Sequence, residues 1–396
     1  MINPSIQGWV DKFLAEQKET TAYKNEIDFY YKTRGTGFIF GHITSLDISI
    51  NYDLKEWLPS EISKIGLLSS LYNMYLMVNT KNNTEDFKEK ITSFYDLLKP
   101  KGFNPLHLII ESSSASYKIE KIIDERIQTN ENLFSKSFSH VLTNALLFID
   151  VLAFEKYLKN GTFELKYLNK IEDLVISIIS FSLQTKTGIS EHDELLLKLF
   201  ESSVRYNKTF NSTVSSIDDL DISFLTSYLE RFYLIDLAAV SLWSDEKVEN
   251  EERYFLFKLG EKLIVSEQFI LESIHFVNSF IAKYKTEIPY FNNSNPVKNF
   301  YDQTTENVVL LINRNKNRFI KELSESKELM QLIAKSTHKE LDKTEKKKIK
   351  NQLLDICKTV PSLTIFLLPG GSLLLPILIK FIPKLLPSSF NENIEN

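Results

Sequence analysis

The chain has 396 residues, a formal net charge of -5 at pH 7 and an isoelectric point near 5.8. This acidic balance argues against a general nucleic-acid binder, because such proteins carry an excess of Lys and Arg that contacts phosphates. The single cysteine, Cys357, excludes an internal disulfide and a zinc site built from cysteines. A chain of this length predicts two or three domains with sizeable cores.

The N-terminal region is predicted to be helical. Residues 5–18 place apolar side chains at helical spacing, and we expect Asn3 to cap this helix with Pro4 in its first turn. No basic segment followed by an apolar core begins the chain, so we predict no secretion signal and expect a cytoplasmic body. A second helix is expected over residues 21–32.

The next stretch, residues 33–54, is the best candidate for extended structure. Leu46, Ile48 and Ile50 alternate with polar residues, which is typical of a short strand or hairpin, although a loop fits equally well. Beyond it, Gly and Pro are almost absent until the tail, while 28 Phe and 17 Tyr suit large helix–helix cores. The predicted helices of this part cover 59–79, 84–99 and 116–128.

From residue 131 onward the pattern is continuously helical, with expected helices at 131–159, 163–184, 190–206, 219–243, 249–263 and 267–283. Two degenerate copies of a helix, polar loop and acidic helix start follow each other at an offset of 59 to 60 residues. The second copy, AAVSLWSDEKVENEERYFLFKLGEKLIVSEQ, resembles the TerB family of tellurite-resistance-associated helical domains. Glu246 stands where that family usually has glycine, and Lys186 stands in place of the acid in the first copy.

The second copy contains the candidate metal site, formed by Asp245, Glu249 and Glu252. Carboxylates in a tight loop are the ligands that hard divalent cations prefer. In the TerB-like resemblance, Asp245 and Glu252 match the acidic metal-binding positions. The alternative is that acids in a first helical turn complement the helix dipole, and Lys247 within the loop favours that interpretation. Weak binding of a divalent cation is therefore one hypothesis, and no other cofactor is predicted.

The run at 286–300 is rich in Asn and Pro and is predicted to be a linker. Charged amphipathic helices at about 301–323 and 325–337 follow, and then a basic segment at 343–350. Its lysines stand one or two helical turns before an apolar tail, which is favourable beside an anionic leaflet. The candidate membrane-surface residues, including two lysines of the tail itself, are Lys346, Lys347, Lys348, Lys350, Lys380 and Lys384.

The tail, residues 359–390, is apolar but interrupted by five prolines. Such a run is long enough to span a bilayer, since about 20 apolar residues cross the hydrocarbon core. The prolines and the Gly370–Gly371 pair instead predict two short helices in a kinked hairpin, because each proline removes a donor and clashes with the preceding turn. The candidate membrane-contact residues are Phe366, Leu367, Leu368, Leu373, Leu374, Leu375, Ile377, Leu378, Phe381 and Ile382.

The segments PSLTIFLLPGG, LLLPILIKF and PKLLPSSF resemble the proline-punctuated segment of the LETM family of inner-mitochondrial-membrane proteins, which are tied to cation/proton exchange. The whole chain, from its start PSIQGWVDKFLAEQK, is similar to the bacterial group called LETM-related biofilm-associated proteins. The resemblance implies a role at a membrane. The acidic residues linked to transport in the exchangers have no counterpart between Val360 and Phe390, and we predict no exchange activity.

These patterns together predict an all-α protein, a multi-helix bundle with a TerB-like central domain and a proline-kinked apolar C-terminal helical hairpin. Its expected domains are an N-terminal helical domain at 1–130, the TerB-like domain at 131–285, the linker and the charged helices with their tail at 301–396. Motifs for nucleotide binding, zinc catalysis and serine hydrolases are missing from the sequence, so we predict no enzyme. The favoured function is a non-enzymatic protein that binds membrane lipid on the cytoplasmic face of the cytoplasmic membrane and an unknown protein partner. The alternatives are a cation/proton exchange component formed by oligomerised tails, and a soluble scaffold whose tail is buried.

Overall fold

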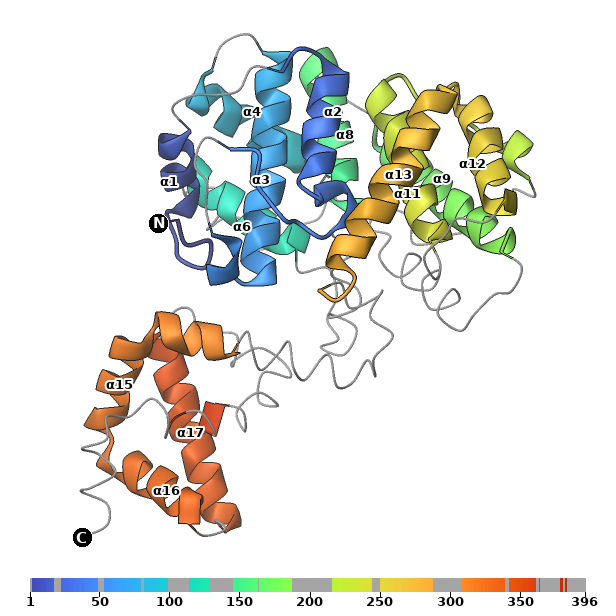
Figure 1. Ribbon diagram of the computed structural model, residues 1–396. Coiled ribbons are helices and arrows are strands. Elements are labelled where there is room, and N and C mark those ends of the chain that lie inside the picture. The colour runs from blue at the N-terminus through green and yellow to red at the C-terminus, as the bar shows by residue number, and fades with distance from the viewer. Residues whose placement is uncertain are drawn as a thin grey trace.

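The computed structural model describes residues 2–17, 23–48, 53–79, 82–98, 114–127, 145–162, 164–186, 216–243, 250–287, 308–338 and 342–360, with residues 363, 378, 379 and 382. Secondary structure within these residues is helical and includes no strand, which confirms the predicted all-α class. Figure 1 shows two groups of helices. We call residues 2–287 the body and the described residues from 308 to 382 the C-terminal unit.

The described residues of the body form ten labelled α-helices. They are α1 (Trp9–Glu16), α2 (Glu26–Gly35), α3 (Pro59–Val78), α4 (Thr84–Leu98), α6 (Ala115–Ile127), α8 (Phe148–Asn160), α9 (Leu165–Gln184), α11 (Tyr228–Leu242), α12 (Asn250–Leu263) and α13 (Glu267–Tyr284). Short 3₁₀ turns cover Phe38–Phe40, Leu54–Glu56 and Ile217–Asp219. The predicted helices at 59–79, 84–99, 116–128, 249–263 and 267–283 agree with these bounds to within one residue at each end. The helix predicted at 190–206 lies outside the described residues.

Local capping explains where two helices start later than predicted. The helix predicted from residue 219 begins at Tyr228, because the Glu230 carboxylate accepts a hydrogen bond from the Ser227 backbone N–H at 2.8 Å and fixes the helix start there. The prediction of Asn3 as a helix cap was wrong. Helix α1 begins at Trp9, after Gly8 at φ 93°, and the Asn3 side chain instead accepts the N–H of Ser5 within a turn.

In the described part of the segment proposed as a strand or a loop, residues 33–48 and 53–54, there is no strand. The segment contains the 3₁₀ turn Phe38–Phe40, flanked by Gly37 and Gly41, which both have positive φ. Glycine is required at position 37, since a Cβ there would lie 2.0 Å from the carbonyl oxygen of His42. The turn buries its three side chains. Of the alternating residues that suggested extended structure, Leu46 and Ile48 are partly buried against the core, and Ile50 lies outside the described residues.

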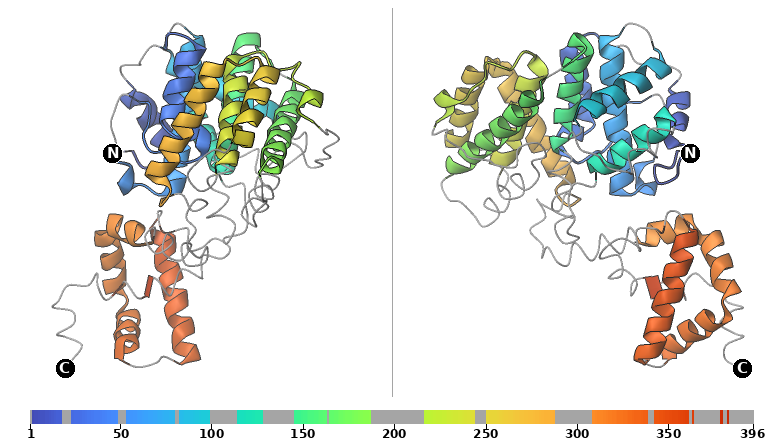
Figure 2. Two further views of the ribbon diagram at one scale, coloured as in Figure 1. Left: turned by 45° about the vertical axis from the view of Figure 1, so that its right-hand side comes forward. Right: turned by 180° about the vertical axis from the view of Figure 1, so that it is seen from behind.

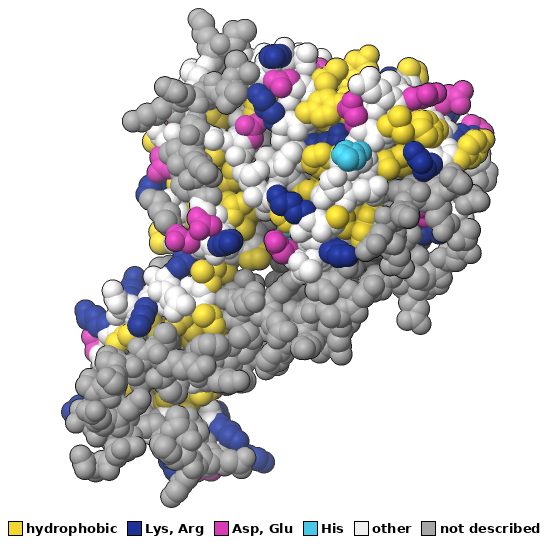
Figure 3. All heavy atoms as spheres, viewed as in Figure 1, with side chains coloured by type: hydrophobic (Ala, Val, Ile, Leu, Met, Phe, Trp, Pro, Cys, Tyr) yellow, Lys and Arg dark blue, Asp and Glu magenta, His cyan; other side chains and the backbone are white. Residues whose placement is uncertain are grey.

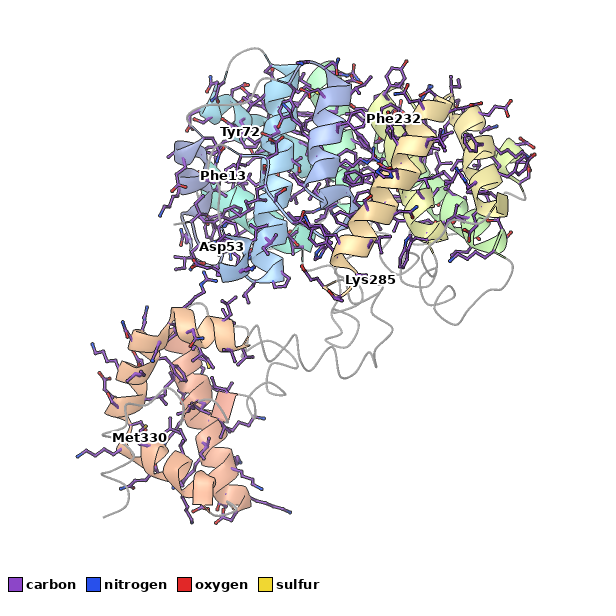
Figure 4. The ribbon with its side chains drawn as sticks, in the orientation of Figure 1. Phe13, Asp53, Tyr72, Phe232, Lys285 and Met330 are labelled. Atoms are coloured by element: carbon purple, nitrogen blue, oxygen red, sulfur yellow. The ribbon has the colours of Figure 1, made fainter. Side chains whose placement is uncertain are left out.

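One hydrophobic cluster runs through the whole body and includes residues on both sides of the predicted boundary at residue 130. Helix α3 packs on α8, and α11 packs on α9 and α13 (Figures 1 and 2). Aromatic edge-to-face contacts tie these layers together, such as Phe13 with Tyr72 at 6.2 Å between ring centroids (Figure 4) and Tyr30 with Phe232 at 5.5 Å.

Charged side chains are also buried in this core. Asp236 of α11 accepts hydrogen bonds from Tyr30 and Ser273, each at 2.5 Å, and its Oδ2 lies 3.3 Å from Nε of the buried Arg34. Burial raises the pKa of Asp236, while the neighbouring Arg34 opposes that change. This network links α2, α11 and α13, and so joins the start of the chain to its centre.

A second buried carboxylate joins α4, α6 and α8. Asp150 receives two hydrogen bonds from Arg126, at 2.5 and 2.7 Å, and one from the Tyr95 hydroxyl at 2.9 Å. A bidentate guanidinium–carboxylate pair fixes both the distance and the orientation of the two helices that carry it. The body is therefore held by directional contacts as well as by apolar burial.

The C-terminal unit has its own apolar core. Its labelled helices are α15 (Lys316–Glu325), α16 (Lys327–His338) and α17 (Lys343–Thr359), and residues 308–314 add a further helical segment. Phe319, Leu323 and Leu353 are fully buried in this second core, and Met330 of α16 contributes to it as well (Figure 4). Leu58, which precedes α3 in the body, belongs to the same cluster.

Candidate functional site: the C-terminal unit

Helix α17 organises the C-terminal unit. Its start is fixed by Asp342, whose Oδ1 accepts the N–H groups of Thr344 at 2.7 Å and Glu345 at 2.8 Å, while Glu345 returns a contact to the N–H of Asp342. The hydroxyl of Thr344 also donates to Oδ1 of Asp342, and this hydrogen bond, followed by those from the backbone N–H groups of Glu345 and Thr344, lowers the pKa of Asp342. The helix then buries one stripe of side chains at positions 349, 353, 356 and 357, the spacing expected for one face of an α-helix.

One flank of α17 is neutralised by ion pairs with α16. Glu345 contacts Lys335 at 2.5 Å, and Lys348 contacts Glu328 at 2.7 Å. Gln352 adds a hydrogen bond to Glu328 at 2.9 Å. Positions 345, 348 and 352 are three and four residues apart, so they share this side of the helix.

The opposite flank carries lysines without an acidic neighbour. Lys343, Lys346, Lys347 and Lys350 are exposed, and no described carboxylate lies within ion-pair distance of any of them. With 3.6 residues per turn, these positions fall on the side of the helix away from α16. We call this set the lysine flank. Figure 3 shows Lys and Arg side chains along the edges of the C-terminal unit.

Of the predicted membrane-surface lysines, Lys346, Lys347 and Lys350 therefore belong to the lysine flank, whereas Lys348 is paired with Glu328. Lys380 and Lys384 lie outside the described residues. The sequence is also divided in charge: residues 301–396 hold 15 Lys and Arg against 11 Asp and Glu, and residues 1–300 hold 32 against 41. The unit is thus basic and the body acidic.

Beyond Val360, four residues of the apolar tail are described, and they lie in the second core. Leu363, Leu378 and Ile382 are 0% exposed, and Ile379 is partly buried against the same cluster. Leu378 and Ile382 were predicted to contact a membrane, and the structure packs them with α15, α16 and α17 instead of leaving them open to solvent. The remaining predicted membrane-contact residues, Phe366, Leu367, Leu368, Leu373, Leu374, Leu375, Ile377 and Phe381, lie outside the described residues.

Cys357 is part of this core and is fully buried. Burial raises the pKa of its thiol to about 12, so very little thiolate is present at neutral pH. The residue therefore behaves as a small apolar side chain. Within the described residues, no helix is long and apolar enough to cross a membrane.

Of the proposed metal ligands, the structure describes Glu252 of α12, which is 2% exposed. Asp245 and Glu249 lie outside the described residues. Among the described residues, no group of three His, Cys, Asp or Glu side chains is placed to hold a metal ion. The hypothesis of a divalent cation at this loop stays a prediction.

Sequence reasoning missed the contact between Arg314 and Glu61, which are 2.7 Å apart although they are far from each other in the chain. Part of the signal was present. Glu61 follows Pro59 in the phrase LPSE, which is typical of a helix N-terminus with an acid in its first turn. The partner, one of two arginines in residues 314–321, could not have been chosen from the sequence.

In the comparison with known families, residues 341–396 match the family described as LETM1-like, RBD. The match covers α17 and the tail, which are the residues that carry the resemblance found in the sequence. It supports a LETM relation for this part of the chain. The comparisons with curated proteins and with solved structures find no match.

Proposed function

We propose that this chain is a non-enzymatic interaction protein that attaches to the cytoplasmic face of a bacterial membrane through its C-terminal unit. The acidic helical body, with its TerB-like central region, then binds partner proteins in a role affecting the envelope, ion homeostasis or biofilm. The observation that carries the proposal is the sorting of charge on α17, where one flank is neutralised by α16 and the other presents the lysine flank.

Unpaired lysines near an anionic leaflet contribute about 1 kcal/mol each, and this attraction falls off within a Debye length. The lysine flank is thus suited to reversible, salt-dependent attachment. The LETM1-like match over residues 341–396 supports the same part of the chain as the membrane-facing element.

Sedimentation with vesicles tests the proposal. The full chain should bind vesicles containing phosphatidylserine, bind neutral phosphatidylcholine vesicles weakly, and be released by 0.5 M salt. The variant K343Q/K347Q/K350Q should lose most of this binding. The control K335Q/K348Q/K358Q removes the same net charge from lysines that pair with Glu345, Glu328 and Asp355, and it should bind nearly as well as the wild type. Equal binding by the two variants would contradict the proposal.

A specific observation favours a second candidate, the soluble scaffold with a buried tail. Leu363, Leu378 and Ile382 fill the second core, so a chain ending at Lys358 would lose apolar packing as well as a possible lipid contact. Truncation therefore cannot separate the two candidates.

The reactivity of Cys357 separates these two candidates better, because it is the chain's one cysteine and is buried beside the tail residues. If the tail leaves the core for lipid, a thiol reagent should modify Cys357 faster when anionic vesicles are added. An unchanged rate together with vesicle binding would mean attachment by the lysine flank alone, and an unchanged rate without binding would favour the scaffold. The same vesicles, prepared with a potassium gradient, test cation/proton exchange, and we expect no flux.

A further inference from the structure

The C-terminal unit meets the body at the first turn of α3. Leu58, the residue before α3, is buried in the second core with Val308 and Leu311. Next to it, Nη1 of Arg314 lies 2.7 Å from Oε2 of Glu61, whose side chain is 0% exposed. An apolar anchor and a charge-assisted hydrogen bond therefore occur together at this junction.

Glu61 has other partners in the body. Its Oε2 also accepts the backbone N–H of Leu58 at 2.9 Å, and its Oε1 accepts the hydroxyl of Ser5 at 2.6 Å. An acidic side chain in the first turn is further favoured by the helix dipole of α3. The carboxylate therefore keeps hydrogen-bond partners when Arg314 moves away, and the body does not need the unit to satisfy it.

Few other described contacts join the C-terminal unit to the body, so the junction is narrow. Among the described residues, the helix pairs with extensive packing lie within the body or within the unit, and none of them joins the two. The opposite net charges of the two parts of the chain add a long-range attraction, which salt screens. Because the junction has few contacts and one strong polar contact, the C-terminal unit can separate from the body in a single step.

We propose that the C-terminal unit docks reversibly on the N-terminal end of α3 through a latch formed by Leu58, Glu61 and Arg314. The latch sets where the lysine flank stands relative to the acidic body, and its opening moves the flank away from that body. This docking goes beyond the proposed membrane attachment, and its test uses no lipid.

Distances between two spin labels measure the docked fraction directly. Cysteines introduced at Glu89 of α4 and Lys321 of α15 place labels at exposed positions on the two parts. Cys357 can remain, because its burial and raised pKa keep it unlabelled. In the wild type at low salt, we expect one dominant distance between the two labels. Arg314→Gln should lower the ratio of docked to undocked molecules about tenfold, as expected for losing a hydrogen bond between charged groups.

Arg318→Gln is the matched control, because Arg318 is exposed one turn further along and has no described acidic partner. It should leave the distance distribution unchanged. Glu61→Gln, which keeps an acceptor for the Leu58 N–H, should match Arg314→Gln, and the double variant should be no worse than either single one. Leu58→Ala should also lower the docked fraction without changing charge.

Several results would overturn the latch. One is a wild type without a dominant distance at low salt. Another is an Arg314→Gln variant that behaves like Arg318→Gln, and a third is additive effects of the Arg314 and Glu61 variants. Thermal unfolding of each variant by circular dichroism checks that a change in distance comes from undocking of folded parts.

Discussion

The body and the C-terminal unit are both helical, but their cores are held together by different forces. The body buries charged groups, including Asp236 with Arg34 and Asp150 near Arg126. In the described part of the C-terminal unit, every buried side chain is apolar, and the ion pairs between the unit's own residues lie on the surface. The core of the body is therefore held by many directional contacts, whereas the core of the C-terminal unit is held by apolar packing.

This difference matters for function. A buried carboxylate is tolerated only with its partners in place, so the body is restricted to one arrangement of α2, α11 and α13. Surface pairs contribute little to stability, typically about 0 to 1 kcal/mol. The charges of the C-terminal unit are thus free to serve binding, which fits an attachment element carried by a rigid body.

The largest expected effect comes from breaking the body's central network. Asp236→Ala leaves Arg34 buried without its carboxylate, and removing one partner of a buried pair costs about 3 to 5 kcal/mol. Urea unfolding followed by tryptophan fluorescence measures it, since Trp9, Trp57 and Trp243 all lie in the body.

The control for this variant is Asp218→Ala, which removes the exposed partner of Lys258 in the body and should change stability by less than about 1 kcal/mol. If Asp236→Ala cost no more than this control, the network would not be what holds α2 against α11 and α13.

The second prediction concerns the tail. Leu378→Ala should destabilise the C-terminal unit by about 3 kcal/mol, because the deleted atoms leave a cavity in the second core. The body should keep its urea midpoint by tryptophan fluorescence, while Cys357 should become reactive at lower urea. Ile379→Ala, at a partly buried position, should have a smaller effect. Unchanged Cys357 reactivity in Leu378→Ala would show that the tail does not pack in this core in solution.

Helix bounds could be predicted from the sequence, but the packing of the tail could not. Strongly periodic helices such as α4 and α13 were predicted to within one residue at each end, because a 3.6-residue stripe and local capping groups define them. A run of Leu and Ile is equally suited to lipid and to a protein core, so its apolar composition could not tell where Leu378 and Ile382 pack.

Contacts between residues far apart in the chain could not be predicted either, for a related reason. Asp236 lies in an ordinary apolar helix pattern, and nothing near it in the chain identifies Arg34 or Tyr30 as its partners. Arg314 and Glu61 are 253 residues apart. Local spacing predicts which face of a helix is buried, but the pairing of two buried charges depends on which helices meet.

The third prediction is a pH dependence in the body. Burial raises the pKa of Glu155 to about 7, with Lys159 opposing the change and Glu26 adding to it. The folded state therefore binds more protons than the unfolded state between about pH 4.5 and 7, so this group's stabilisation is complete below pH 4.5 and is lost as pH rises through 7.

In Glu155→Gln this loss should disappear, which flattens the change in unfolding free energy between pH 5 and 8 by on the order of 2 kcal/mol. Lys159 keeps its contact with Glu26 in this variant. Urea unfolding at several pH values measures the slope, with Glu164→Gln as a control at an exposed position. A variant with the wild-type slope would assign the pH dependence to another group.

The smallest expected effect is a gain in stability at the end of α12. Ile264 has φ 57° and is 69% exposed, and the N–H of Val265 donates to the carbonyl of Gly260 at 2.8 Å in the manner of a Schellman motif. A β-branched residue is strained in this left-handed conformation, whereas glycine adopts it freely. Ile264→Gly should therefore stabilise the body by about 1 kcal/mol, seen as a higher urea midpoint in tryptophan fluorescence. Leu271→Gly, an exposed position within α13, should lower the midpoint, since glycine inside a helix costs about 1 kcal/mol. A lower midpoint for both variants would mean that a contact of the Ile264 side chain stabilises the body by more than its backbone strain costs.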